Sequence, residues 1–288
     1  MVQVSFKRGS LTEDIPRRLL TICIAVPILW RGFWWYPQLR TLFFQGVHAV
    51  MCMEWARMTK CSPLGMIIFP LVSVASVNCP DDTLFSLLLL VGVHSFMLSS
   101  DAAVTSPLAQ LQATAGVLLI TIPSRAWLQV SQQFSPTVSL LLTVWNCDTG
   151  ALLAGRLGKA MGTNWEQPSW LKQISRKKTL EGLLGGFVAG VTTFQSLPFF
   201  WSVMTSWNLV PDGTVMELAS MSAWERFKLG CVISIMAIIG DLWESTLKRT
   251  FEAKDSGSLL PGHGGVLDRF DSSLMAVILY AYKIQQGK

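Results

Sequence analysis

Long runs of apolar residues, separated by short polar connections, follow one another along most of this chain. Several runs approach the roughly 20 residues that a helix needs to cross a hydrocarbon core about 30 Å thick. Because backbone groups inside a bilayer must bond within their own segment, the runs predict membrane-spanning helices. No small-residue cleavage site follows the first run, so we expect it to be kept as a span. The predicted spans cover residues 19–36, 38–57, 63–78, 83–99, 109–129, 135–157, 181–203, 224–247 and 267–283.

The amino-acid composition indicates the same class of protein. Of the 288 residues, 51% are hydrophobic and 14% are charged, and the mean hydropathy is +0.43. An ordinary soluble domain carries about 25% charged residues. We therefore expect an all-α, polytopic integral membrane protein with about nine transmembrane helices.

The distribution of basic residues predicts the orientation of the spans, because short loops rich in lysine and arginine stay on the cytoplasmic side. Residues 1–18 and 156–180 are rich in basic residues, whereas residues 204–223 carry two acids and no base. We therefore place the N-terminus, residues 156–180 and the connection after residue 247 on the cytoplasmic side, although Lys283 and Lys288 would then lie on the other side. The net charge of +5 follows from these loops and does not indicate a nucleic-acid partner.

Several polar or reactive residues inside the apolar runs have a plain structural explanation. The six cysteines lie scattered without a CxxC spacing, so we interpret them as small buried residues rather than metal ligands. His48 and His94 are single histidines in apolar surroundings, which favours an imidazole packed against a neighbouring carbonyl over a catalytic role. Glu54 is placed to form a helix-surface pair with Arg57, and its sequence context indicates no function.

Asp148, in the stretch VWNCDTGALLAGRLGKAMG, is the first acid that points to chemistry. A carboxylate within a span costs about 3 kcal/mol on insertion scales and by default marks a functional site. The alternative is a structural ion pair with Arg156, which follows on the same helix face. Glycines at positions 150, 155 and 158 would let another helix approach closely.

A cluster of basic residues, Arg176, Lys177 and Lys178, immediately precedes a helix that we expect to begin between Thr179 and Glu181. Free backbone N–H groups and the helix dipole favour anions at such a position, so the cluster is suited to binding phosphate. The alternative is that these residues only fix the orientation of the span. Both interpretations stay open.

The stretch from Asp241 to Asp271 combines acids, bases and glycines between two apolar segments. On the first of the two helices, Asp241 and Ser245 share a face with Lys248 or Arg249. Asp268 and Asp271 share a face at the start of the next helix. Acids at the mouths of successive helices can converge on a divalent cation, and Mg2+ fits because it takes few carboxylate oxygens and leaves positions for water and substrate phosphates.

Basic residues and a glycine-rich connection accompany these acids. Lys248, Arg249, Lys254 and Arg269 would neutralise phosphate charge nearby. The connection GSLLPGHGG contains several glycines, whose missing Cβ lets the backbone approach a ligand. His263 lies between those glycines, where either a functional role or an idle loop histidine explains it.

Three stretches resemble one known family. The run STLKRTFEAKDSGSLLPGHGGVLDRFD, from Ser245 to Asp271, resembles the C-terminal signature of the phosphatidate cytidylyltransferase (CDP-diacylglycerol synthase) family. DTGALLAGRLGKAMG and SRKKTLEGLLGG resemble two further elements of that family, with Arg176 in place of a usual proline. The resemblance covers residues 140–280 well, and residues before 135 only in hydropathy.

The resemblance implies a reaction of CTP with phosphatidic acid that gives CDP-diacylglycerol and diphosphate for phospholipid synthesis. It implies Mg2+ bound by Asp241 and Asp268, and leaves a second cation open. Lys177 and Lys178 would hold nucleotide phosphates, and Asp148 would be a site residue without a defined role. The other residues that it implies for the catalytic cavity are Ser245, Lys248, Arg249, Lys254, Asp255, His263 and Arg269.

The resemblance also bears on organisation and location. We divide the chain into an N-terminal transmembrane scaffold, residues 1–135, and a C-terminal catalytic region, residues 136–288, whose polar site faces the cytoplasm. The acyl chains of the lipid substrate would stay in the bilayer. The resemblance further implies a homodimer, in the bacterial inner membrane or an equivalent organellar membrane.

Two other functions compete with this one. A related CTP-dependent enzyme could act on a prenol or an ether lipid. An ion-coupled membrane transporter would use intramembrane acids as a relay, but we would then expect two similar halves. Instead, acids inside the predicted spans are concentrated after residue 140.

Overall fold

A computed structural model describes residues 36–61, 63, 65–99, 107–163, 165–175, 177–210, 220–257, 259 and 264–286. The regular secondary structure of these residues is helical, which confirms the all-α prediction. The helices are α2 (Pro37–Met58), α3 (Gly65–Val77), α4 (Asp82–Ser99), α5 (Pro107–Ser131), α6 (Phe134–Met161), α7 (Ser169–Ile174), α8 (Leu180–Ser206), α10 (Ala223–Thr250) and α11 (Leu267–Gln286).

These helices follow the apolar runs of the sequence. Each predicted span from residue 38 onward corresponds to one helix. The first predicted span, residues 19–36, lies outside the described residues apart from its last position. The short helix α7 was not predicted, because six residues are too few to show a helical period.

Two of the helices, α6 and α8, are each long and apolar enough to cross a membrane. Helix α3 and the first part of α4, Asp82–Val91, are apolar but shorter. The outer faces of α6 and α8 expose large apolar side chains, as expected of a surface that faces lipid. Among these exposed side chains are Leu152, Leu157, Leu184, Val188 and Phe199. The chain therefore has the features of a membrane-associated protein.

The ends of several helices are fixed by local hydrogen bonds. Helix α8 begins after Thr179, whose side-chain oxygen accepts a hydrogen bond from the Gly182 N–H. This confirms the predicted start between Thr179 and Glu181. Helix α10 begins with a reciprocal pair of bonds between Ser222 and Glu225.

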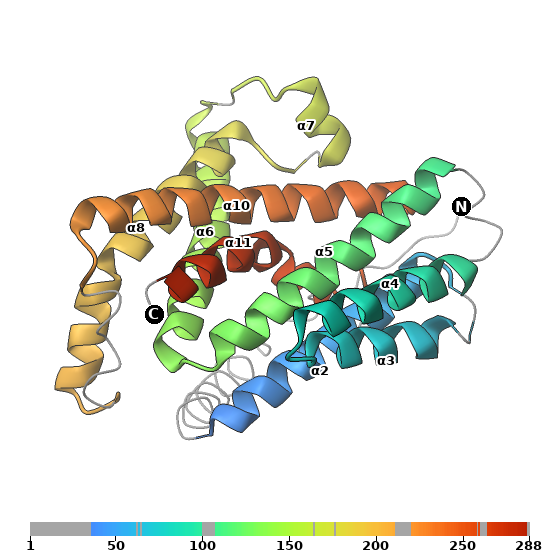
Figure 1. Ribbon diagram of the computed structural model, residues 1–288. Helices are drawn as coiled ribbons and strands as arrows, with labels where there is room; N and C mark the ends of the chain where they lie inside the picture. The colour runs from blue at the N-terminus through green and yellow to red at the C-terminus, as the bar shows by residue number, and fades with distance from the viewer. Residues whose placement is uncertain are drawn as a thin grey trace, which may run out of the picture.

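The helices form two groups that share part of their core. Helices α2 to α5 lie together on one side of the molecule, and α6 and α8 on the other, with α10 running across both (Figure 1). Helix α11 packs against α10 and α5 and joins the two groups. One hydrophobic cluster combines Trp55, Ile120, Leu247 and Leu274, which come from α2, α5, α10 and α11. Burial of apolar surface therefore fixes the polar ends of α10 and α11 relative to α2.

Helices α6 and α8 pack closely through small residues. A Cβ at Gly150 would lie 2.8 Å from the carbonyl oxygen of Gly185, and one at Gly182 would lie 3.0 Å from that of Ala151. This is the close approach that the glycines of α6 led us to expect. It fixes the start of α8, and with it Lys178, beside α6.

The polar residues predicted to be structural are indeed packed inside the protein. His48 is fully buried, with Nε2 2.9 Å from Ser73 Oγ. The packed interpretation of this histidine is confirmed, although its partner is a hydroxyl rather than a carbonyl. The side chain of His94 lies outside the described part of the structure. Cysteines 52, 61 and 147 are free and buried, as predicted, whereas Cys79 and Cys231 are free but only half-buried, and Cys23 lies outside the described residues.

Candidate functional site

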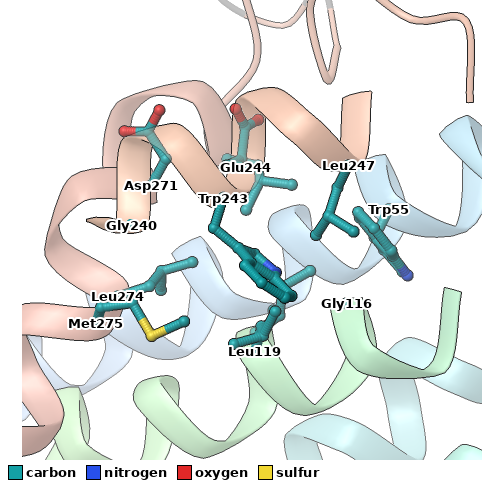
Figure 2. A pocket seen from close by; sticks show the side chains of 12 residues that line it. Trp55, Gly116, Leu119, Gly240, Trp243, Glu244, Leu247, Asp271, Leu274 and Met275 are labelled. Atoms are coloured by element: carbon teal, nitrogen blue, oxygen red, sulfur yellow. The ribbon is translucent and has the colours of Figure 1, made fainter. Parts of the chain in front are cut away.

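The acids of α10 and α11 come together where the two helices touch at Gly240. A Cβ at this position would lie 2.5 Å from the carbonyl oxygen of Asp271, so the contact requires glycine. Figure 2 shows the carboxylates of Glu244, on α10, and Asp271, on α11, pointing to the same side. We call the residues gathered here the polar cluster: Asp148, Lys178, Asp241, Glu244, Ser245, Lys248, Asp268, Asp271 and Ser272.

Lys178 links the start of α8 to α10. Its Nζ lies 2.8 Å from Asp241 Oδ1, and it donates hydrogen bonds of 3.1 Å to the Asp241 carbonyl and to Ser245 Oγ. The Lys178 side chain is 19% exposed and that of Asp241 is 35% exposed. The structure thus brings three predicted site residues together, with the Asp241 carboxylate still accessible.

Lys248 forms a second, more buried group. Its Nζ lies 2.5 Å from Glu244 Oε2 and 2.6 Å from Asp268 Oδ1. The other oxygen of Asp268 accepts hydrogen bonds from the backbone N–H groups of Ser256, at 2.9 Å, and Gly265, at 2.8 Å. Asp268 is therefore fixed by one cation and two amides, a geometry that keeps its carboxylate ionised and in one orientation.

Asp148 joins the polar cluster from α6. Its Oδ1 accepts a 2.9 Å hydrogen bond from Ser272 Oγ, next to Asp271 on α11. Asp271 Oδ1 in turn accepts a 2.7 Å bond from the Ser272 N–H. The predicted alternative partner, Arg156, is exposed, so the hydrogen bond that the structure gives Asp148 runs to another helix instead.

The remaining predicted site residues that the structure describes are exposed on the surface. Arg249 is exposed and donates to the carbonyls of Ile174 on α7, at 3.4 Å, and Ala253, at 3.2 Å. His263 and Arg176 lie outside the described residues. The predicted site residues that are exposed on the surface are Lys177, Lys254, Asp255 and Arg269.

The oxygen donors at the site fit the type of ligand that Mg2+ takes. Asp241 is accessible, and Asp268 lies one helix away on α11. Within the described residues, no group of three or more His, Cys, Asp or Glu side chains could hold a metal ion. Mg2+ usually takes one or two protein carboxylates and keeps water and substrate phosphates as its other ligands.

Two carboxylates of this region were missed or misread from the sequence. Glu244 was missed, although its position four residues before Lys248 on one helix was a usable signal. The prediction that Glu54 pairs with Arg57 on the helix surface is wrong. Glu54 is buried and bonds to Ser256 and to the backbone at residues 266 and 267, because the fold brings α2 against the start of α11.

An apolar cavity adjoins the polar cluster (Figure 2). It is partly open, has a volume of about 30 Å3, and lies between α2, α5, α10 and α11. Glu244 and Asp271 line it together with apolar side chains, among them Leu119, Trp243 and Leu274. The cavity has room for about one water-sized group, so it is a gap in the packing beside the two acids rather than a ligand pocket.

Comparison with known proteins agrees with this picture. Residues 16–286 match the model of the cytidylyltransferase family. A phosphatidate cytidylyltransferase of Rickettsia prowazekii is 31% identical over 211 residues, which cover 72% of this chain and 83% of that protein.

Relatives from Staphylococcus match a shorter part of the chain. The phosphatidate cytidylyltransferase of Staphylococcus haemolyticus is 38% identical over 138 residues, or 48% of this chain and 44% of that protein. That of Staphylococcus epidermidis is 39% identical over 141 residues, again 44% of that protein. The matched part of this chain thus spans less than half the length of these two relatives. Since the family model extends over nearly the whole sequence, the chain belongs to the cytidylyltransferase family.

Proposed function

We propose that this protein is a phosphatidate cytidylyltransferase that converts CTP and phosphatidic acid into CDP-diacylglycerol and diphosphate. The observation that carries the proposal is the polar cluster, in which a lysine just before α8 and a lysine on α10 each pair with a carboxylate of α10 or α11. The names of the relatives from Rickettsia and Staphylococcus support the same activity.

The reaction joins two polyanions, and its main requirement is compensation of negative charge. An oxygen of the lipid phosphate attacks the α-phosphorus of CTP, and the bond to the β-phosphate breaks with its electron pair leaving on diphosphate. A phosphate monoester has a second pKa of about 6, so the nucleophile is largely ionised and needs no protein base. Cations at the site lower the repulsion and stabilise the leaving group.

In this proposal Asp241 and Asp268 hold Mg2+, and Lys177 and Lys178 bind the nucleotide phosphates. When bound, Mg2+ would neutralise charge on the triphosphate and on the departing diphosphate. Lys178 has a second task before CTP arrives, because it pairs with Asp241. If Lys178 bound a nucleotide phosphate in place of Asp241, the Asp241 carboxylate would be free to bind the metal ion. Nucleotide and metal binding would then support each other.

Lys248 acts differently in this proposal. Its ammonium lies between Glu244 and Asp268, and both side chains of the Lys248–Asp268 pair are almost fully buried, at 11% and 7% exposed. It therefore neutralises and orients Asp268 rather than reaching out to substrate. Ser245 Oγ accepts a hydrogen bond from Lys178 and so holds this lysine against α10.

The proposal places the protein in a membrane as a multi-pass enzyme with about nine spans. Its site would face the cytoplasm of a bacterial inner membrane or the equivalent side of an organellar membrane, in a homodimer. The apolar lengths of α6 and α8 support spanning.

The test is incorporation of labelled CTP into lipid by the purified protein, with a panel of acceptors. We expect label in the lipid fraction with phosphatidic acid, and none with a prenol or with diacylglycerol, which lack the attacking phosphate. Incorporation into a prenol would favour the alternative CTP-dependent enzyme. Ion uptake into vesicles without any incorporation would favour the transporter.

A further inference from the structure

Glu54 is a buried carboxylate from the N-terminal helices that reaches the connection between α10 and α11. It lies near the end of α2 and is 3% exposed. Its Oε1 accepts a 2.9 Å hydrogen bond from the Val266 N–H, and its Oε2 accepts bonds from the Leu267 N–H, at 2.8 Å, and Ser256 Oγ, at 3.1 Å. Leu267 is the first residue of α11, so Glu54 satisfies N–H groups that the helix itself leaves without partners.

The same connection is held from its other side by Asp268. One oxygen of Asp268 accepts bonds from the Ser256 and Gly265 N–H groups, and the other faces Lys248. Ser256 is thus shared: its hydroxyl bonds to Glu54 and its N–H to Asp268. We call Glu54, Ser256 and Asp268 the carboxylate clamp.

Two glycines show that the backbone lies directly against the Glu54 carboxylate. A Cβ at Gly257 would lie 2.5 Å from Glu54 Oε1, and one at Gly265 would lie 2.6 Å from Glu54 Oε2. Both distances are too short for any side chain without displacement of the carboxylate. A side chain at Gly257 or Gly265 would therefore disturb the hydrogen bonds that Glu54 makes.

Within the described residues, Glu54 forms no ion pair with a lysine or arginine. An ionised carboxylate that leaves water must regain its lost hydration, and here backbone N–H groups and a hydroxyl provide it. The three bonds converge on the Glu54 side chain and tie Ser256 to residues 266 and 267 at the start of α11. Asp268 accepts hydrogen bonds from the N–H groups of Ser256 and Gly265. The three bonds of Glu54 therefore also help to fix the orientation of the Asp268 side chain.

We propose that Glu54 is a positioning residue: it holds residues 256, 266 and 267 in the arrangement that orients Asp268 and Lys248, without itself touching substrate. The role in catalysis rests on the proposed function, in which Asp268 holds Mg2+. The clamp itself does not rest on that function, so the two parts are tested separately.

The activity test compares Glu54→Gln with Asp82→Asn as a matched control, since Asp82 is an exposed acid of the N-terminal helices that pairs with Arg125. Loss of a residue that orients a metal ligand typically costs about 10- to 100-fold in metal affinity or activity. We therefore expect Glu54→Gln to raise the Mg2+ concentration for half-maximal turnover about tenfold or to lower kcat by that factor. Asp82→Asn should match the wild type in both.

Hydrogen exchange tests the clamp without any assay of activity. In Glu54→Gln, the backbone N–H groups of residues 264–268 should exchange about tenfold faster. The reason is that the glutamine side chain has only one acceptor oxygen and cannot accept all three bonds. Exchange in α6 and α8 should stay as in the wild type. Faster exchange throughout the protein, with an unchanged Mg2+ requirement, would mean that Glu54 serves only global stability, and would overturn the proposal.

A second pair of variants keeps the test decisive if Glu54→Gln does not accumulate. Gly257→Ala should lower turnover because its methyl group meets the Glu54 carboxylate, and it should have little further effect in a Glu54→Ala background. Ser256→Ala removes one bond and should shift turnover and exchange in the same direction by less. Fully additive effects of Gly257→Ala and Glu54→Ala would contradict the clamp.

A wild-type protein without any CDP-diacylglycerol formation would instead refute the proposed function, while the exchange result would still decide the clamp.

Discussion

The two groups of helices use their buried charges in different ways. In α2 to α5, Arg40 donates to the carbonyls of Ser131 and Gln132, and Glu54 accepts from backbone N–H groups, so these charges bond to the main chain. In α8, α10 and α11, lysines pair with carboxylates instead, as Lys178 does with Asp241. The first arrangement completes helix ends, and the second leaves charges that can change partners.

This difference indicates where chemistry can occur. A buried charge that bonds only to backbone and hydroxyl groups stays in place, because moving it would leave those groups without a hydrogen bond. A lysine–carboxylate pair can open when a phosphate or a metal ion offers each member a new partner of opposite charge. The accessible Lys178–Asp241 pair is therefore the best candidate for contact with substrate, and the buried N-terminal charges are supports.

The largest effect that this comparison predicts is at the carboxylates of the lysine pairs. Asp241→Asn or Asp268→Asn should each lower Mg2+-dependent formation of CDP-diacylglycerol by about 100-fold or more, because the metal loses a charged ligand. The variants should still be found in the membrane fraction. Turnover like that of the wild type in either variant would remove the corresponding residue from the metal site.

A smaller effect is expected at the lysines before α8. The double variant Lys177→Ala with Lys178→Ala should raise the KM for CTP about tenfold, since the lost bond of Lys178 to a charged group is worth about 1.5 kcal/mol and the exposed Lys177 adds little. The KM for phosphatidic acid should change less. Lys172→Ala, an exposed lysine on α7, provides the control. An unchanged KM for CTP in the double variant would contradict the nucleotide role.

Asp148→Asn should lower kcat/KM by less than about tenfold. The amide oxygen can still accept the bond from Ser272, so the link between α6 and α11 persists while the negative charge is lost. Steady-state kcat/KM for both substrates measures this effect. A loss as large as that of Asp241→Asn would place Asp148 among the groups that contact substrate or metal.

The smallest effect on turnover is predicted for His48 in the N-terminal helices. His48→Gln disturbs the contact with Ser73 and should lower the free energy of unfolding by about 1 kcal/mol. Turnover at a temperature well below unfolding should stay within about twofold of the wild type. Thermal unfolding in detergent, measured beside turnover, checks both. Loss of turnover without a change in unfolding temperature would mean that His48 takes part in catalysis, which contradicts the comparison.

The sequence predicted helices well and long-range contacts poorly. The apolar runs and the Thr179 cap located α8 because both signals are local. The shared face of Asp241 and Ser245 was also local, and the structure places them together with Lys178. The contact between Glu54 and residues 256–267 was not visible, since it joins positions about 200 residues apart that become neighbours only when α2 packs against α11.

The direct test of the central claim is a label-transfer measurement with CTP labelled on either the α- or the γ-phosphate. The wild-type protein, with phosphatidic acid and Mg2+, should move only the α-label into lipid, should lose this activity in EDTA, and should regain it when Mg2+ is restored. Transfer of the γ-label, or transfer of the α-label that EDTA leaves unchanged, would contradict a Mg2+-dependent cytidylyl transfer at the lysine–carboxylate pairs.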